Sequence, residues 1–160
     1  MKLIGQGTDY ADEICKMFED SNLFDSFSPD ELKIFAQYAE VYDLERGATL
    51  FNEGDISERM YLIVRGKVDV YKQNDAYKNK KITTIHAGKT IGEMSIIDGL
   101  PCSATAITAE PSRLVLIYKE NFLQFTKNHP VQCLKLTLKI SKLLSLRLRR
   151  ATNIIADYLD

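Results

Sequence analysis

Residues 87–105 read AGKTIGEMSIIDGLPCSAT and form the most informative segment of the chain. The pair Gly92-Glu93 opens the short apolar run Met94–Ile97, which we predict to be a brief helix. A turn over Asp98–Pro101 follows, and a predicted strand begins at Ser103. The N–H groups at a helix start favour a phosphate, and glycine lets a ligand approach closely. A carboxylate such as Glu93 suits a ribose hydroxyl.

Short β-rich runs separated by glycines surround this stretch. Glycines at 47, 54, 66 and 88 stand where tight turns need positive φ or the absence of a Cβ. Such spacing predicts an antiparallel β-roll or jelly roll. The predicted strands are Val41–Leu44, Thr49–Phe51, Met60–Val64, Lys67–Tyr71, Lys81–Ile85, Ser103–Thr108 and Arg113–Tyr118.

Helical patterns flank the predicted roll. Thr8 or Asp9 can cap a first helix, and Ser28-Pro29-Asp30-Glu31 has the residues of a capping box with proline at the first helical position. At 160 residues and 45% hydrophobic, the chain has the size of one domain. We therefore expect a mainly β domain over 1–160, with N-terminal helices over 1–40, the roll over 41–118 and C-terminal helices over 119–160.

One long helix is predicted after the break at Asn128-His129-Pro130, because about 30 residues follow without Gly or Pro. On a helical wheel one stripe resembles a coiled-coil seam, which predicts a parallel homodimer through 131–159. Its residues are Leu134, Leu138, Ser141, Ser145, Leu148, Thr152, Ile155 and Leu159. A second stripe is expected to pack on the roll and contains Leu136, Ile140, Leu143, Leu144, Ala151 and Ile154. The alternative is a helix buried within its own subunit.

The overall charge and the cysteines limit which cellular compartment and which binding partners are expected. The 21 Lys+Arg nearly balance the 22 Asp+Glu, and the basic helix face of Lys135, Lys139, Lys142, Arg149 and Arg150 lacks interleaved aromatic residues, so direct DNA binding is not expected. Three scattered cysteines without a CxxC fit reduced thiols and a cytoplasmic location. With no signal peptide and no apolar run near ~18 residues, no membrane association is expected.

Enzymatic and metal-dependent functions find little support in the residues. The only histidines, His86 and His129, have no partner at metal-ligand spacing, and Cys15 is the only cysteine of the N-terminal region. No paired acid and base and no nucleophile motif are evident. We therefore expect a binding protein without a metal or a resident cofactor.

The stretch 87–105 resembles the phosphate-binding cassette of cyclic-nucleotide-binding domains, as found in catabolite-activator-type regulators and protein kinase A regulatory subunits. The segments at 46–55, 60–68 and 22–32 resemble the early roll, the central hairpin and the lead-in helices of this family. Residues 147–157 resemble the dimer helix of the activator branch, which continues into a helix-turn-helix, whereas this sequence stops at Asp160. The resemblance implies a β-roll that binds cyclic AMP or cyclic GMP and reports through its last helix.

The family pattern also implies the ligand-binding residues. Gly92, Glu93, Ser103 and Ala104 would contact the ligand, with backbone donors from Met94 and Ser95. Cys102 stands in the place of the cassette arginine, and the loss of that charged contact weakens binding by about 2–5 kcal/mol.

Two of these residues have alternative interpretations. Arg147 either reaches into the pocket to replace the missing charge or covers apolar surface with its stem while its head stays in solvent. Cys102 is either a redox-sensing thiol or a small buried thiol that fills the space of the arginine.

Two functions follow from these features. The first is a regulatory sensor that binds a cyclic nucleotide or a related phosphorylated small molecule and signals through its C-terminal helix. The second is a degenerate member of the family that serves as a ligand-independent interaction and dimerisation module, as the cysteine at 102 indicates.

Overall fold

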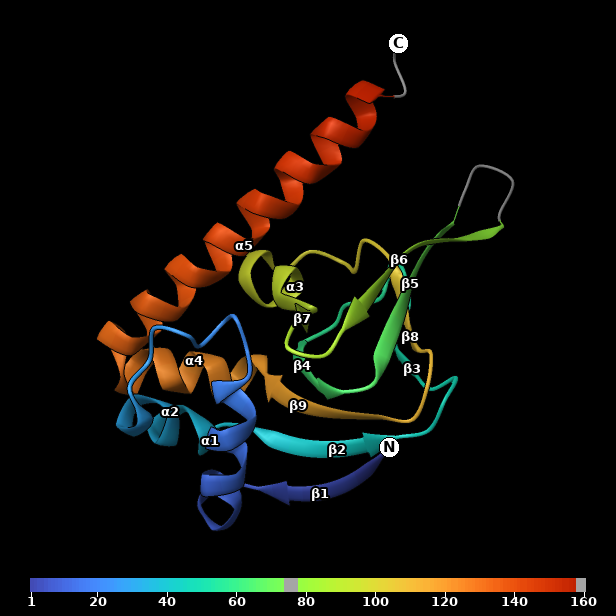
Figure 1. Ribbon diagram of the computed structural model, residues 1–160. Helices are drawn as coiled ribbons and strands as arrows, with labels where there is room; N and C mark the ends of the chain where they lie inside the picture. The colour runs from blue at the N-terminus through green and yellow to red at the C-terminus, as the bar shows by residue number, and fades with distance from the viewer. Residues whose placement is uncertain (74–77, 158–160) are drawn as a thin grey trace.

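The strands pair into two antiparallel sheets that form a β-roll (Figure 1). The computed structural model describes residues 1–73 and 78–157. One sheet has the strand order β1-β2-β9-β4-β7 and the other the order β3-β8-β5-β6. The strands are β1 (Lys2–Gln6), β2 (Glu40–Leu44), β3 (Thr49–Phe51), β4 (Arg59–Arg65), β5 (Lys67–Gln73), β6 (Asn79–His86), β7 (Thr90–Ile91), β8 (Thr105–Thr108) and β9 (Ser112–Tyr118).

Successive residues of the central strand β4 enter two different hydrophobic cores. Met60 and Leu62 pack among the helices, whereas Tyr61 and Ile63 pack between the two sheets. Side chains alternate across a strand, so a strand buried on both faces is apolar at every position. This explains the unbroken hydrophobic run 60–64, and the structure confirms the expected mainly β fold with flanking helices.

Helices cover the outer face of the first sheet. After the 3-10 turn η1 (Thr8–Tyr10), they are α1 (Ala11–Glu19), α2 (Pro29–Ala36), α3 (Glu93–Asp98), α4 (Lys119–Asn128) and α5 (Pro130–Asp157). The capping box of α2 is confirmed, since the Ser28 hydroxyl accepts from the Glu31 amide at 3.3 Å and the Glu31 carboxylate accepts from the Ser28 amide at 2.8 Å. Phe35 of α2 and Phe125 of α4 meet at 4.7 Å between ring centroids, which joins the two helical ends of the chain.

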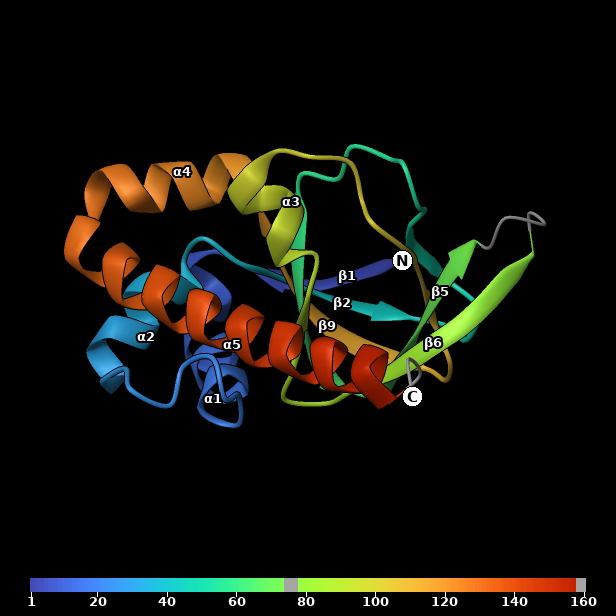
Figure 2. The ribbon, with the colours of Figure 1, turned by 90° about the horizontal axis from the view of Figure 1, so that it is seen from above.

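A sharp corner separates α4 from α5, as Figure 2 shows. His129 lies between them with φ −136° and ψ 63°, outside the helical region, and Pro130 starts α5. Proline disfavours a helical conformation in the residue before it. The predicted break is confirmed, and it turns α5 so that its C-terminal half leads away from α4 and passes the roll (Figure 1).

Two short strands were not predicted from the sequence. β1 lies in the segment 1–40, which was expected to be helical, and pairs with β2 from Lys2↔Asp43 to Gln6↔Glu40. β7 pairs with β4 through Tyr61↔Ile91. Each is too short to show a period in the sequence and becomes a strand because a neighbouring edge offers hydrogen bonds.

Two predicted boundaries were also wrong. The strand expected from Ser103 begins at Thr105, because Cys102 bonds instead to the loop before β4: its amide donates to Asp55 O and its carbonyl accepts from the Gly54 amide, both at 2.8 Å. The first α-helix begins at Ala11 and not directly after Thr8 or Asp9, since Thr8–Tyr10 form a 3-10 turn without a side-chain cap.

The two predicted stripes of α5 have different environments. Leu136 and Ile140 are buried against the core, and Leu143 and Leu144 pack partly against it. Ala151 and Ile154 were expected on the same stripe but are exposed, because α5 has passed beyond the roll at that point. The seam residues are all exposed, so burial within the subunit is wrong for this face: Leu134, Leu138, Ser141, Ser145, Leu148, Thr152 and Ile155. Leu159 lies outside the described residues.

Candidate functional site

Helix α3 is positioned by glycines at both ends. Gly92 has φ +84°, and a Cβ at this position would lie 2.6 Å from the carbonyl oxygen of Arg59. Only glycine fits that combination of left-handed backbone and close approach. Gly99, with φ +70°, ends the helix by donating its amide to Ser95 O at 3.1 Å. The short helix therefore lies directly against β4, with Glu93 as its first residue.

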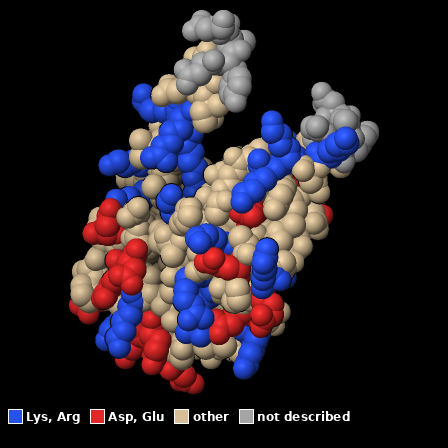
Figure 3. Space-filling model, turned by 45° about the vertical axis from the view of Figure 1, so that its right-hand side comes forward, with Lys and Arg blue, Asp and Glu red and all other residues tan. Residues whose placement is uncertain are grey.

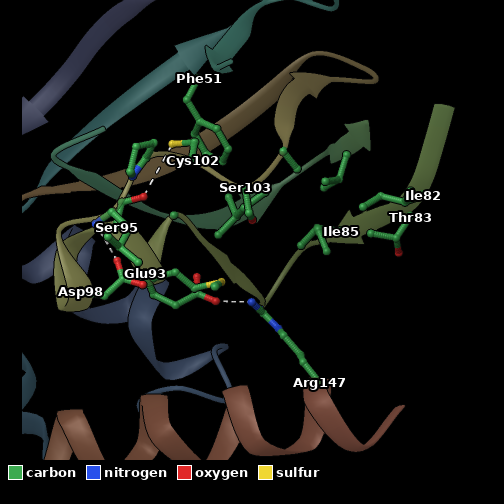
Figure 4. A pocket seen from close by; sticks show the side chains of 17 residues that line it. Phe51, Ile82, Thr83, Ile85, Glu93, Ser95, Asp98, Cys102, Ser103 and Arg147 are labelled. Carbon is green, nitrogen blue, oxygen red and sulfur yellow. Dashed lines mark hydrogen bonds and ion pairs between the residues drawn. The ribbon is translucent and has the colours of Figure 1, made fainter. Parts of the chain in front are cut away.

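A pocket of about 380 Å³ lies between α3, the turn after it and the strands β5 and β6 (Figure 4). All eight residues that the sequence singled out line this pocket: Gly92, Glu93, Met94, Ser95, Cys102, Ser103, Ala104 and Arg147. Seven of them belong to the continuous stretch 92–104, whereas Arg147 comes from α5. The fold therefore brings the last helix to the same cavity as the cassette.

Arg147 forms the direct bridge between α5 and the cassette. Its guanidinium Nη1 pairs with Glu93 Oε1, and its Nη2 donates to the carbonyl oxygen of Thr90 at 2.7 Å. Figure 4 shows the side chain rising from α5 toward Glu93. Of the two alternatives for Arg147, the structure has the one in which it reaches into the pocket, where it meets a carboxylate.

The carboxylate of Glu93 is almost fully buried, with a side chain 3% exposed. Its second oxygen, Oε2, is buried without a hydrogen-bond partner among the described residues, and so is the Thr90 hydroxyl. A buried polar atom without a partner costs about 1–3 kcal/mol. Among the described residues, Arg147 is the only cation that forms an ion pair with Glu93.

Cys102 occupies the wall of the pocket opposite α5. It is 5% exposed, and its sulfur lies 3.6 Å from the Ser95 hydroxyl. The other two cysteines, Cys15 and Cys133, are also free and buried. The structure agrees with a small buried thiol that fills the wall, and it places no arginine at this position.

Few charges face the cavity. Among the described lining residues, Arg147 is the only lysine or arginine, while Glu93 and Asp98 are acidic. Lys72 lies behind Ser103: its ammonium donates to Ser103 O at 2.8 Å and pairs with Glu53. The Gln73 amide, which donates to the Glu53 carboxylate, lowers the pKa of Glu53, and the ion pair with Lys72 lowers it further.

Basic side chains gather on two parts of the surface, and some of them are paired with acidic residues. Figure 3 shows them along α5 and over the β5–β6 hairpin. On α5, Lys135 pairs with Glu31 at 2.7 Å and Lys139 with Asp25 at 2.5 Å. Arg149 and Arg150 are exposed beyond them.

The strands contribute a part of the pocket that the sequence did not predict. Most of these residues are apolar, and they come from β3, β5, β6, β7, the end of α3 and the turn after it: Phe51, Val70, Ile82, Thr83, Ile85, Ile91, Asp98, Leu100 and Pro101. Strand periodicity predicts which side chains share a face, but it does not tell which faces converge on a cavity.

In residues 1–73 and 78–157, no group of three or more His, Cys, Asp or Glu side chains is arranged to hold a metal ion. None of the helices there combines the length and the apolar character that crossing a lipid bilayer requires.

Comparison with known proteins identifies the family. Residues 42–129 match the profile of the cyclic nucleotide-binding domain. The chain is 27% identical to the cyclic AMP receptor protein of Thermus thermophilus over 82% of its own length and 59% of that protein. It is 26% identical to a CRP-like cAMP-activated global transcriptional regulator of Mycobacterium tuberculosis over 86% of its length and 59% of the regulator.

A solved structure resembles nearly the whole chain. The cyclic nucleotide-binding domain from Methylobacillus flagellatus superposes with a TM-score of 0.84 at 30% identity, covering 96% of this chain and 86% of that one. The chain therefore belongs to the cyclic nucleotide-binding domain family, and the two relatives named above are a receptor protein and a transcriptional regulator. The matching part spans 59% of the length of the receptor protein and of the transcriptional regulator.

Proposed function

We propose that this protein is a regulatory sensor that binds a cyclic nucleotide or a related phosphorylated small molecule in the pocket of about 380 Å³ and signals through α5. The observation that carries the proposal is that one pocket joins the cassette residues 92–104 to a residue of the long helix, Arg147. A ligand in the pocket thus contacts both the cassette residues and α5.

The chemistry of the lining supports a ligand with an apolar face and a few polar groups. Phe51, Val70 and Ile85 line one side and suit the flat surface of a base, as most small-molecule pockets are predominantly apolar. Glu93 contributes a carboxylate whose buried oxygen Oε2 has no partner among the described residues and can accept from a ligand hydroxyl once the side chain turns toward the cavity. Ser103 and Arg147 provide a hydroxyl and a cation for a phosphate.

The substitution at the cassette sets the expected affinity. Without an arginine at 102, Arg147 is the only cation of the described lining, and it is shared with Glu93 and the Thr90 carbonyl. A shared cation stabilises a ligand phosphate less than a dedicated bidentate arginine does. We therefore expect weak binding, with Cys102→Arg increasing the affinity for cyclic AMP at least about tenfold.

Titration calorimetry with cyclic AMP, cyclic GMP and a cyclic dinucleotide tests this function. The natural protein, Cys102→Arg and Glu93→Gln are compared, with Glu110→Gln as a control because Glu110 pairs with Lys67 outside the pocket. Glu93→Gln should weaken binding and the control should not change it. Absence of heat with the natural protein at millimolar concentrations of every nucleotide would rule out this ligand class.

The second candidate is a ligand-independent interaction module. It is favoured by Cys102, by the pairing of Arg147 with Glu93, and by the exposed apolar stripe of α5. Under this hypothesis the natural protein binds no nucleotide, and Cys102→Arg alone creates binding. Binding by the natural protein would exclude it.

Both candidates include association through α5. We propose a parallel homodimer in which Leu134, Leu138, Leu148 and Ile155 contact their copies, since their exposed fractions are 61%, 63%, 68% and 59%. The free buried cysteines are compatible with a reducing, cytoplasmic location, which we propose together with the dimer. Direct DNA binding by this chain is not part of the proposal.

A further inference from the structure

The two halves of α5 are held to the rest of the molecule in different ways. Cys133, Leu136 and Ile140 in the first half are buried in the helical core. Within the described residues, the last hydrogen bonds from α5 to the roll come from Arg147, and residues 148–156 are all exposed. These residues, 148–156, are called the distal half of α5. Their position therefore depends more on the single polar contact of Arg147 than on hydrophobic packing.

The Arg147–Glu93 ion pair also occupies the carboxylate to which a ligand hydroxyl would bond. Glu93 Oε1 pairs with Arg147, and the side chain is 3% exposed, so a ligand hydroxyl finds no free, accessible carboxylate oxygen. A ligand can bond to Glu93 only if the carboxylate turns toward the cavity or Arg147 withdraws. In the same way, Arg147 can face a phosphate only by giving up Glu93 or the Thr90 carbonyl.

We propose that the Arg147–Glu93 ion pair is a latch that holds the distal half of α5 against the roll in the ligand-free protein and that a bound nucleotide opens it. The second part of this inference rests on the proposed function. A nucleotide carries a partner for each half of the pair, because its sugar hydroxyls can donate to the carboxylate and its phosphate can accept from the guanidinium. Insertion between the two side chains exchanges one set of charge-assisted hydrogen bonds for another.

The latch couples ligand binding in the pocket to the movement of α5. Ligand binding and release of α5 are thermodynamically coupled. If the ligand raises the affinity of the released helix for a partner, that partner raises the affinity for the ligand by the same factor. The exposed seam residues Leu148 and Ile155 lie beyond the latch and move with the distal half. Ligand binding in the pocket thus moves the surface at which a second copy is expected to bind.

Hydrogen–deuterium exchange of the ligand-free protein tests the latch directly. Glu93→Gln and Arg147→Gln are compared with the natural protein and with the control Arg149→Gln, whose exposed side chain is two residues from the latch. We expect the amides of 148–156 to exchange roughly five- to tenfold faster in both latch variants, as for the loss of one charge-assisted contact, with no change in the control.

Further variants separate the ion pair from unrelated effects. The double variant should exchange no faster than either single one, because both remove the same contact. Arg147→Lys keeps the charge but not the fork that reaches Glu93 and the Thr90 carbonyl together, so it should give an intermediate rate. Arg147 is 39% exposed, so its variants should fold even if a change at the buried Glu93 does not.

The outcomes distinguish this inference from the proposed function. Unchanged exchange in both Glu93→Gln and Arg147→Gln, or effects that simply add in the double variant, would overturn the latch whatever calorimetry shows. Faster exchange in these variants together with no nucleotide binding would overturn the proposed ligand and support the latch. Cyclic AMP that binds the natural protein should accelerate exchange at 148–156 as the variants do, and a slower rate would contradict opening by the ligand.

Discussion

At the scale of single residues, the clearest electrostatic contact of the roll joins Asp43 of β2 to Arg113 of β9. The two residues face each other across the strands, and the guanidinium donates to both carboxylate oxygens at 2.7 and 2.8 Å. These hydrogen bonds lower the pKa of Asp43 and raise that of Arg113. Both side chains are about one third exposed, with 30% for Arg113 and 36% for Asp43, so the pair is moderately strong.

This pair predicts a pH-dependent stability. A carboxyl whose pKa is lower in the folded state stabilises the protein above its unfolded pKa of about 4 and loses that contribution as the pH falls through the folded value. Asp43→Asn should therefore reduce the free energy of unfolding by about 0.5–1 kcal/mol at neutral pH and by almost nothing near pH 2. Urea unfolding at the two pH values measures the difference.

Asp12→Asn is the matched control for this prediction. Asp12 pairs with Lys33 at 3.2 Å, but its side chain is 72% exposed, so its removal should leave stability nearly unchanged at both pH values. An equal loss of stability for Asp43→Asn at neutral and acid pH would show that the effect comes from packing and not from the ion pair.

At the scale of elements, α5 shows how one helix can have two different roles. Leu136 is fully buried, whereas Leu138 is 63% exposed, although they are two residues apart on the same helix. Leu136→Ala should lower the free energy of unfolding by about 2–5 kcal/mol, since it leaves a cavity in the helical core. Leu138→Ala should change it by less than about 0.5 kcal/mol.

Denaturant unfolding at low protein concentration compares these two variants, because dilution removes any contribution of a dimer to Leu138. Similar losses for both would mean that the seam face of α5 packs within its own subunit in solution. A loss at Leu138 that appears only at high concentration would instead support the dimer.

The elements also differ in how well the sequence predicts them. The capping box at Ser28 and the break before Pro130 depend on residues a few positions apart, so local rules predict both. The strands β1 and β7 depend on partners at distant positions, namely β2 and β4. Their own residues carry no periodic signal, and only the assembled sheet makes them strands.

At the scale of the whole molecule, the exposed stripe of α5 predicts the oligomeric state. The seam face combines exposed leucines and isoleucine with the hydroxyl residues Ser141, Ser145 and Thr152. Such a mixed face should associate more weakly than an all-leucine coiled coil. Light scattering should detect a dimer at high micromolar concentration, and Leu148→Asp should weaken it at least about tenfold because a charge would be buried at the interface.

Arg150→Gln serves as the control for the dimer, since it removes an exposed charge from the same turn of α5 without adding one to the seam. It should leave the association unchanged. A strictly monomeric natural protein, or a dimer that Leu148→Asp does not affect, would mean that the stripe has a different partner.

Local sequence patterns predicted the β-roll, the helix break and the exposed and buried stripes of α5 up to Leu144, and the resemblance to the family indicated the cassette residues of the pocket. Each depends on local periodicity, on turn residues or on a contiguous stretch such as 92–104, where neighbours in the chain remain neighbours in space. The pairing of Arg147 with Glu93, 54 positions earlier, and the contribution of Phe51, Val70 and Ile85 to the pocket depend on the tertiary structure. The angle between α4 and α5 and the convergence of two sheets bring these groups together. Periodicity along one element gives the direction of a side chain relative to that element, whereas the partner of that side chain depends on how all the elements pack.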